Sequence, residues 1–358
     1  MGGQSSAKSI VIDVITLRFG LIAAVAGAQV LTASVVQAQR SKPARNTVLI
    51  SGSSTVYPFS KAAIELFAAR VPQGTSIRAE AVGTSAGFRQ FCGRSLPIAA
   101  ASRPINSTEI NRCKANGVRF LELPVAFDAI TVVVNPNNSF AKEISTAQLR
   151  TLWQQKAQGT VTRWNQLNPA WPSNPIKLCG PGKDSGTYDT FNKAINGSES
   201  NSRQDYTASE DDMVLVRCVA NEANALGYFG FDYYQANRTS LRALAVKGLR
   251  GAVVPSVNAV QTSRYLPLSR PLFFYVNEQS FRSNPVIRAL IVSTLEQGVK
   301  VANRAGVIPL QDSTYRLVTN KLYRNVLGSA FAGQLPIGLT IGQVLERSFD
   351  QHKKPQFR

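Results

Sequence analysis

The stretch that decides the fold is Ser51-Gly52-Ser53-Ser54-Thr55-Val56-Tyr57-Pro58. It follows the apolar run Val48–Ile50 and precedes an apolar-periodic segment, Phe59–Ala69, so it predicts a strand, a small-residue loop and a helix. Pro58 suits the start of that helix, where its missing N–H costs nothing. Hydroxyls and backbone N–H groups at a helix N-terminus favour the binding of a small anion, although one such loop is also typical of an ordinary strand-to-helix turn.

The chain repeats this arrangement twice. Ser76–Val82 alternates like a strand and leads into the small-residue loop Gly83–Phe88. Ile176–Cys179 leads into the loop Gly180–Thr187, with a helix predicted over Tyr188–Ala194. Strands that alternate with helices predict an α/β fold with largely parallel sheets. The three loops would then gather at the carboxyl ends of the strands, where such sheets bind their ligands.

Two long apolar strands are predicted over Arg119–Asn135 and Pro267–Val276, and both suit a crossing between two domains. Residues 196–212 are polar and are expected on the surface. Further helices are predicted over Phe88–Phe91, Ser107–Lys114, Thr146–Trp153 and Pro285–Ala302.

Residues 1–38 resemble a secretory signal peptide. Lys8 and Arg18 flank the start of an apolar, small-residue run, Phe19–Val36, and a cleavage-like site makes Gln39 the expected first mature residue. An uncleaved membrane anchor is the alternative, but the run is short and rich in Ala and Gly, which favours removal. We therefore expect a periplasmic protein, with association to the membrane left open.

The chain has four cysteines: Cys92, Cys113, Cys179 and Cys218. If the protein is exported, these residues are in a compartment where disulfides can form. An even number of Cys in an exported protein predicts disulfides, with three possible connectivities. Zinc is less favoured, because no Cys-x-x-Cys spacing occurs and His352 is the only histidine.

The 358-residue chain has a formal net charge of +19. Residues 39–127 and 267–358 together carry +15, whereas residues 128–266 carry +3. A field of this sign attracts phosphate, acidic lipid headgroups or nucleic acid. The export signal and the lack of an Arg-rich helix or an RNA-binding aromatic motif argue against nucleic acid.

Rival functions leave fewer signs in the sequence. An exported hydrolase would use a Ser nucleophile, but His352 lies in a basic tail and no Gly-x-Ser-x-Gly elbow occurs. A metal-dependent phosphatase would need clustered His, so neither a cofactor nor a metal is expected. A basic protein that binds an anionic surface remains an alternative.

Six stretches together resemble the signature motifs of periplasmic phosphate-binding proteins of the PstS family, and look closest to its cyanobacterial SphX branch. Each motif alone is weak, but their number and order make the resemblance specific, and it covers nearly the whole mature chain. The stretches are Gly52–Pro58, Gly83–Phe88, Ala101–Ile105, Asp184–Tyr188, Gly227–Gly230 and Tyr265–Phe273.

The resemblance implies a two-lobed, type II binding protein that closes around phosphate and delivers it to an ABC permease. It implies a first lobe over 45–127 plus 267–358 and a second lobe over 128–266, with the two long strands as the hinge. Pairing within each lobe favours the disulfides 92–113 and 179–218.

The same resemblance implies the ligands of the anion, which are Ser54, Thr55, Ser85, Ser185, Gly186 and Thr187. Two departures from the enterobacterial pattern concern charge. Arg103 stands where an Asp is expected, and the Arg that precedes the Ser-Gly-Thr loop is absent near Pro181. Arg103 is therefore predicted to supply the guanidinium, and Asp128 to accept the proton of phosphate. The missing Asp leaves sulfate or arsenate as alternative ligands.

Overall fold

The computed structural model describes residues 46–183, 185–198, 200–248, 251–331 and 340–352. The predicted signal peptide, residues 1–38, lies outside these ranges, as does Asp184 of the third loop. The described residues belong to one compact unit, Pro43–Arg358.

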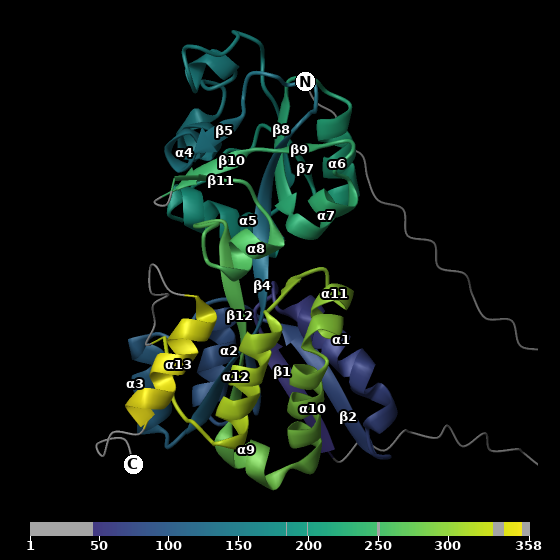
Figure 1. The fold of residues 1–358 in the computed structure, drawn as a ribbon, viewed down its shortest axis with the longest axis vertical. Helices are drawn as coiled ribbons and strands as arrows, with labels where there is room; N and C mark the ends of the chain where they lie inside the picture. Colours follow the sequence, from purple (N-terminus) through teal and green to yellow (C-terminus); the bar gives the residue numbers. More distant parts are fainter. Residues whose placement is uncertain (1–45, 184, 199, 249–250, 332–339, 353–358) are drawn as a thin grey trace, which may run out of the picture. The chain divides into compact units, whose positions relative to one another are not determined.

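Strands and helices alternate along most of this unit (Figure 1). The strands are β1 (Asn46–Gly52), β2 (Thr75–Ala81), β3 (Ile98–Ala101), β4 (Phe120–Val134), β5 (Glu143–Ser145), β6 (Lys177–Pro181), β7 (Thr207–Ser209), β8 (Ala225–Gly230), β9 (Arg242–Ala243), β10 (Ala245–Gly248), β11 (Gly251–Val253), β12 (Ser269–Asn277) and β13 (Ile308–Pro309). The α-helices are α1 (Tyr57–Phe67), α2 (Thr84–Cys92), α3 (Ser107–Ala115), α4 (Thr146–Trp153), α5 (Gly186–Phe191), α6 (Asp212–Ala220), α7 (Phe231–Ala236), α8 (Val257–Gln261), α9 (Glu278–Ser283), α10 (Pro285–Glu296), α11 (Gly298–Arg304), α12 (Asp312–Tyr323) and α13 (Ile341–His352). Short 3₁₀ turns are η1 (Ala68–Arg70), η2 (Gln155–Ala157) and η3 (Trp164–Gln166), and η4 (Asn192–Asn196) is a π-turn that continues α5.

The described strands form a ten-stranded sheet and a separate three-stranded sheet of β5, β10 and β11. The larger sheet has the order β2-β1-β3-β12-β4-β8-β6-β7, with β13 and β9 also paired to β4. β1 pairs in parallel with β2 and β3, and β6 pairs in parallel with β7 and β8. The parallel pairs therefore form two groups, a first half around β1 and a second half around β6, and their carboxyl ends carry the predicted loops.

β4 pairs in both halves of the sheet, whereas β12 pairs with β3 and with the early part of β4 in the first half (Figure 1). The early part of β4 pairs with β12 in antiparallel fashion as far as Ala129, and its later part pairs with β8 from Ile130 onward. The prediction of two long strands is thus confirmed, and β4 crosses between the two groups of strands. The exact lobe boundaries, at 127/128 and 266/267, stay a prediction.

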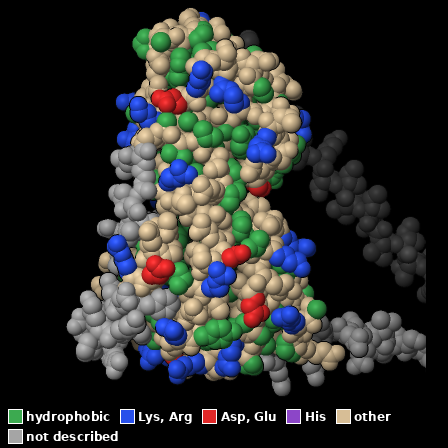
Figure 2. Space-filling view, viewed as in Figure 1, with side chains coloured by type: hydrophobic (Ala, Val, Ile, Leu, Met, Phe, Trp, Pro, Cys, Tyr) green, Lys and Arg blue, Asp and Glu red, His purple; other side chains and the backbone are tan. Residues whose placement is uncertain are grey.

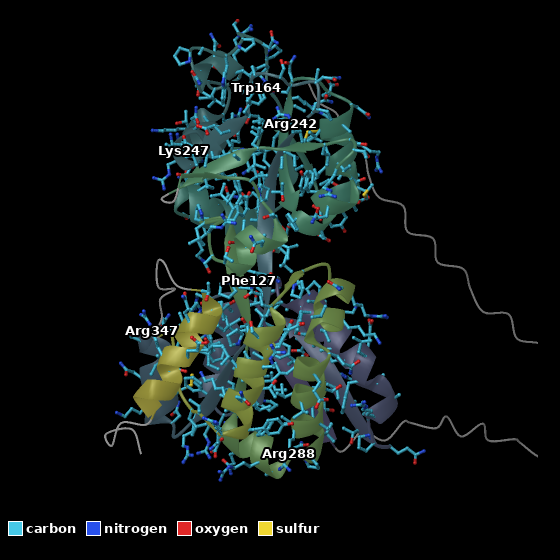
Figure 3. The ribbon with its side chains drawn as sticks, in the orientation of Figure 1. Phe127, Trp164, Arg242, Lys247, Arg288 and Arg347 are labelled. Atoms are coloured by element: carbon cyan, nitrogen blue, oxygen red, sulfur yellow. A yellow bond between two sulfur atoms is a disulfide. The ribbon has the colours of Figure 1, made fainter. Side chains whose placement is uncertain are left out.

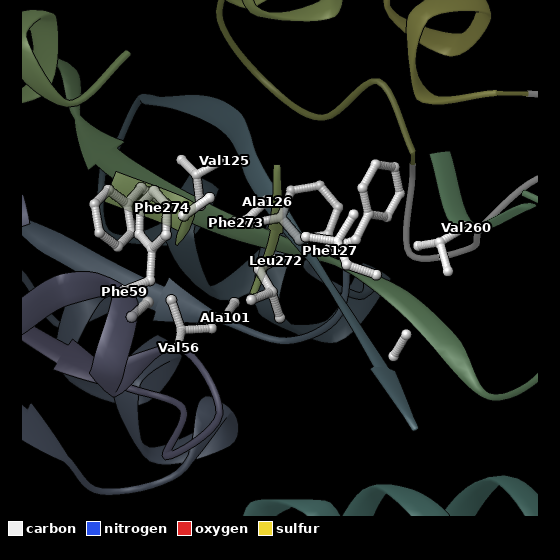
Figure 4. Packing of buried hydrophobic residues seen from close by; sticks show 14 of the residues in the cluster. Val56, Phe59, Ala101, Val125, Ala126, Phe127, Val260, Leu272, Phe273 and Phe274 are labelled. Atoms are coloured by element: carbon white, nitrogen blue, oxygen red, sulfur yellow. The ribbon is translucent and has the colours of Figure 1, made fainter. Parts of the chain in front are cut away.

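The core of the first half packs helices α1 and α2 against the sheet (Figure 4). Phe59 of α1 meets Phe274 of β12 edge-to-face, with 5.6 Å between ring centroids, and both side chains are buried. Phe127 lies where β4 passes between the two halves (Figure 3). Burial of each large apolar side chain stabilises the fold by about 1.5–3 kcal/mol.

The core of the second half includes a cluster of aromatic rings. The ring centroids of Trp153 and Tyr228 are 4.8 Å apart in an edge-to-face contact. Phe191 stacks on the same Tyr228 ring, with 3.7 Å between the centroids. These contacts fix α4 and α5 against β8. Tyr228, Phe229 and Phe231 are all buried, so these aromatic side chains belong to the core.

Both predicted disulfides are present, one in each half. Cys92–Cys113 joins α2 to α3, and Cys179–Cys218 joins β6 to α6. Each cross-link restricts the unfolded chain, which stabilises the half that contains it.

Three expectations about secondary structure need correction. Helix α2 begins at Thr84 rather than near Phe88, because Gly83, with φ +86°, turns the chain directly into the helix. The polar stretch 196–212 contains the buried Arg203, which bonds to carbonyls of the second half. The helix predicted over 285–302 is two helices, α10 and α11, which meet at Gln297. In the described part of the chain, no helix combines the length and apolar character needed to cross a membrane.

Candidate functional site: an anion cavity at the strand ends

A cavity of about 360 Å³ lies at the carboxyl ends of β1, β2 and β3. Its first wall consists of the loops after these strands and the start of α2, and contributes Ser53, Ser54, Thr55, Val82, Gly83, Thr84, Ser85, Ala86, Arg89, Ser102 and Arg103. Its second wall consists of α5 and the following turn, and contributes Gly186, Asp189, Thr190 and Lys193. Arg270, from the start of β12, completes the lining.

The backbone ties the first wall together. Ser53 N–H donates to the carbonyl of Ala100 at 2.9 Å, and the N–H groups of Val82 and Gly83 both donate to the carbonyl of Gly52. Gly52 has a φ of +145°, and a Cβ placed there would lie 2.0 Å from the Ala100 oxygen. Only glycine permits this approach, so the loop after β1 is fixed by the sheet itself.

Arg103 lies in the first wall with its guanidinium held by Glu109 of α3. Its two terminal nitrogens each donate to a different Glu109 oxygen at 2.8 Å, and Nη2 also donates to Ser85 Oγ at 3.0 Å. The Glu109 hydrogen bonds raise the pKa of Arg103, while partial burial opposes that shift. Glu109 also accepts the backbone N–H of Asn106, so this pair anchors Arg103 to the start of α3.

Arg270 is a second guanidinium in the cavity, and our sequence analysis did not identify it. Its Nη2 donates to Thr55 Oγ1 at 2.7 Å, and its Nε lies 3.3 Å from Asp128 Oδ2. The signal was available, because Arg270 falls within the matching stretch Tyr265–Phe273. Its link to Asp128, 142 residues away, could not be read from that stretch.

The second wall meets the first at the opening loop. A Cβ on Gly186 would lie 2.8 Å from Thr55 Oγ1 and 3.1 Å from Ser54 Oγ, so the two walls are in close approach at this point. Ser185 caps α5, because its Oγ accepts the N–H of Thr187 at 3.1 Å.

The predicted ligands separate into two sets. Five of them line the cavity: Ser54, Thr55, Ser85, Arg103 and Gly186. Three lie outside the lining: Asp128, Ser185 and Thr187. Asp128 stands behind Arg270, and Ser185 and Thr187 stand at the start of α5.

The cavity lining is strongly cationic. Among the residues that the structure describes, its charged members are the cations Arg89, Arg103, Lys193 and Arg270 and one carboxylate, Asp189. A larger groove of about 860 Å³, between α10–α11 and α12, has charges of both signs and offers no such preference. On the face drawn in Figure 2, Lys and Arg side chains are spread over the surface rather than gathered into one stripe. The cavity is thus the place where cations, hydroxyls and backbone N–H groups converge, which is the chemistry that binds a small oxyanion.

No metal site competes with this interpretation among the described residues, where no group of three or more His, Cys, Asp or Glu side chains could hold a metal ion. The side chain of His352 lies outside that part of the chain.

Comparison with known proteins places the chain in a family. A model of the PBP superfamily domain matches residues 37–291. The chain belongs to the PBP superfamily. Within this superfamily, the chain belongs with the SphX and PstS proteins. It is 43% identical over 301 residues to Protein SphX of Synechocystis sp., and the alignment covers 84% of this chain and 89% of the relative. It is also 34% identical over 268 residues to the phosphate-binding protein PstS of Staphylococcus haemolyticus, across 74% and 81% of the two chains.

A solved structure supports the same assignment for this PBP protein. A possible phosphate binding protein from Planctomyces limnophilus superposes with a TM-score of 0.72 at 34% identity, over 78% of this chain and 98% of that one. The fold is therefore the mixed α/β, type II binding-protein fold that the sequence predicted.

Proposed function

We propose that this protein captures inorganic phosphate in the cavity between its two walls, outside the cytoplasm, and delivers it to an ABC permease. The observation that carries the proposal is the described lining of the cavity, which brings together four cations, several hydroxyls and one carboxylate. A dianion in such a site gains charge-assisted hydrogen bonds that a neutral sugar or amino acid would not. The names of the relatives, PstS and a possible phosphate binding protein, agree with this ligand.

The proposed contacts follow the two walls. Hydroxyls of Ser54, Thr55 and Ser85 would donate from the first wall, together with a guanidinium of the cavity lining. The backbone N–H of Gly186 would donate from the second wall. We propose that the two lobes, 45–127 plus 267–358 and 128–266, close on the ligand by bending at β4 and β12, since hinge closure of this kind is a common response to ligand.

Ser185 and Thr187 have a supporting role in this proposal. The hydroxyl of Ser185 accepts the N–H of Thr187, which fixes the start of α5 and so the position of Gly186. Binding of phosphate would require both residues for the shape of the second wall.

Calorimetric titration of the mature chain tests the function directly. We expect one phosphate per chain, and a loss of about tenfold or more in affinity for Ser54→Ala and Ser85→Ala, since a hydrogen bond to a charged group contributes about 1.5–3 kcal/mol. Ser283→Ala is the control, because this exposed hydroxyl lies on α9, away from the cavity. Full phosphate affinity in both cavity variants would remove these loops from the site.

The rival functions have separate readouts. Arsenate should compete with phosphate, whereas equal affinity for sulfate would contradict the ligand assignment. Turnover of a chromogenic phosphate ester would indicate a hydrolase. Retention on anionic vesicles that falls steeply with salt would support peripheral contact with a membrane, as the +15 carried by residues 39–127 and 267–358 suggests.

A further inference from the structure

Arg270 differs from the other cations of the cavity in how it is placed. It sits on β12, and its Cα faces that of Asp128 on β4 in the antiparallel ladder. The two side chains form an ion pair with exposed fractions of 20% and 14%. Opposite charges directly across two strands stabilise each other, so Arg270 is held by the sheet rather than by a loop.

The other end of Arg270 points into the cavity. Its Nη2 donates to Thr55 Oγ1 at 2.7 Å, and this hydroxyl is also the atom that a Cβ on Gly186 of the second wall would approach most closely. Thr55 is therefore the point at which the opening loop, β12 and the second wall meet. A guanidinium fixed beside that point can donate to an anion bound there without first changing its position.

Arg103 is less well placed for the same task. Both of its terminal nitrogens donate to the two oxygens of Glu109. This bidentate pair occupies the side of the guanidinium that would otherwise bind an oxyanion through two parallel hydrogen bonds.

We propose that Arg270 is the guanidinium that contacts the phosphate dianion, and that Asp128 is a positioning residue that orients Arg270 rather than the acceptor of the phosphate proton. This inference rests on the proposed function. It replaces the two roles that the sequence suggested for Arg103 and Asp128, because Asp128 faces Arg270 Nε and does not line the cavity. If Asp128 acts only through Arg270, replacing Asp128 should weaken the binding of phosphate and of sulfate to the same extent.

Calorimetry with inorganic phosphate and with sulfate on the full mature chain tests the proposal. We expect Arg270→Gln to lower phosphate affinity by about tenfold or more, and Arg270→Lys to restore it only in part, because an ammonium lacks the planar fork. Arg304→Gln is the matched control, since it removes the same charge from an exposed ion pair with Glu65. Unchanged phosphate affinity in Arg270→Gln would overturn the inference.

The role of Asp128 is tested by Asp128→Asn and by the double variant with Arg270→Gln. We expect Asp128→Asn to weaken phosphate and sulfate binding by a common factor, and to add nothing once Arg270 is replaced. A selective gain of sulfate binding in Asp128→Asn would overturn the positioning role, as would additive losses in the double variant. Thermal unfolding of each variant checks that the fold is retained.

The outcomes also separate the inference from the function on which it rests. Failure of the parent protein to bind phosphate would overturn both. Binding by the parent, with Arg103→Gln losing affinity and Arg270→Gln retaining it, would leave the function intact and return the guanidinium role to Arg103.

Discussion

The two walls of the cavity differ in what fixes them. The first wall is fixed from behind, because Gly52, Ser53 and Gly83 are hydrogen bonded to neighbouring strands of the sheet. The second wall is one short helix, α5, with a capping serine, and it approaches the first wall through Gly186. The first wall is thus held by hydrogen bonds to the sheet, and the second wall by the capping and packing of α5.

The difference extends to buried charge behind the walls. Behind the first wall, Glu122 is fully buried and accepts hydrogen bonds from Tyr275 Oη at 2.8 Å and from the N–H of Ala330 at 2.7 Å. In the second half, burial and neighbouring carboxylates raise the pKa values of Asp212 and Asp232 to about 6. In the first half, hydrogen bonds and the ammonium of Lys321 compensate the buried charge of Glu122. In the second half, burial disfavours the ionised forms of Asp212 and Asp232. Changes behind the first wall should therefore destabilise the fold, and changes in the second wall should alter binding.

The largest expected effect is on Gly52. In Gly52→Ala the new methyl group would lie 2.0 Å from the Ala100 oxygen at a φ of +145°, and neither backbone can move without breaking the sheet. We expect a loss of about 4 kcal/mol or more in the free energy of unfolding, measured in urea. Gly74→Ala is the control, because it has a φ of +78° with no atom within 4 Å of its Cβ position, and should cost only about 1 kcal/mol. Equal losses in the two variants would show that space beside Ala100 is not the cause.

Gly52 also shows what the sequence can predict. Its strand, loop and helix are local, and small residues at fixed spacing mark them, so the opening motif and the gathering of loops at the strand ends could be predicted. The disulfide pairing followed from the family layout. The contacts of Arg270 and of the buried Arg203 could not be predicted in this way, because their partners are distant in the chain: Thr55 lies 215 residues from Arg270, and Leu152 lies 51 residues from Arg203.

The second prediction concerns the compensated charge behind the first wall. In Glu122→Gln the ammonium of Lys321, 1% exposed and 3.9 Å from Glu122, loses its counter-charge. Burial already lowers the pKa of Lys321, and Glu122 opposes that shift. We expect a loss of about 3 kcal/mol in urea unfolding, since an uncompensated buried charge is costly.

The double variant Glu122→Gln/Lys321→Met is the control for this pair. It removes the orphaned charge and should recover a large part of the loss. Losses that simply add would show that Glu122 acts through its hydrogen bonds to Tyr275 and Ala330 instead. The distinction bears on the site, because Tyr275 Oη also accepts the N–H of Ile105, two residues beyond Arg103.

The third prediction tests the second wall. In Gly186→Ala the methyl group would press on Thr55 Oγ1 and Ser54 Oγ, so the walls could no longer approach as closely. We expect about tenfold weaker phosphate binding by calorimetry, with the free energy of unfolding changed by less than about 0.5 kcal/mol. Gly342→Ala, whose Cβ would make only ordinary contacts of 3.5 Å or more, should change neither quantity. A stability loss like that of Gly52→Ala would mean that the two walls do not differ.

The smallest expected effect is a gain in the free energy of unfolding, and it comes from replacing Asp212, a carboxylate of the second half that burial disfavours. Burial first, and then the charges of Asp232, Asp211 and Glu210, raise the pKa of Asp212 from 3.8 to about 6. The protonated form therefore favours the folded state below about pH 4, and this advantage is lost as the pH rises towards 6. Asp212→Asn keeps the neutral form at every pH, so it should stabilise the protein by about 1 kcal/mol at pH 7.5 after allowance for partial exposure, and by nothing at pH 4.

The pKa of Asp205 is shifted in the opposite direction to that of Asp212, so replacing Asp205 should have the opposite effect on stability. Hydrogen bonds from Arg203 lower the pKa of Asp205 to about 2, so its ionised form stabilises the fold above about pH 4, and that contribution is lost as the pH falls towards 2. Asp205→Asn should therefore lower the urea midpoint at pH 7.5, where Asp212→Asn raises it. Because both carboxylates belong to the second half, opposite signs would show that compensation by a neighbouring cation, rather than location in one half or the other, decides whether a carboxylate stabilises this fold. A loss of stability in Asp212→Asn at pH 7.5 would mean instead that its charge is favoured at the N-terminus of α6, and that the second half compensates its acids as the first half does.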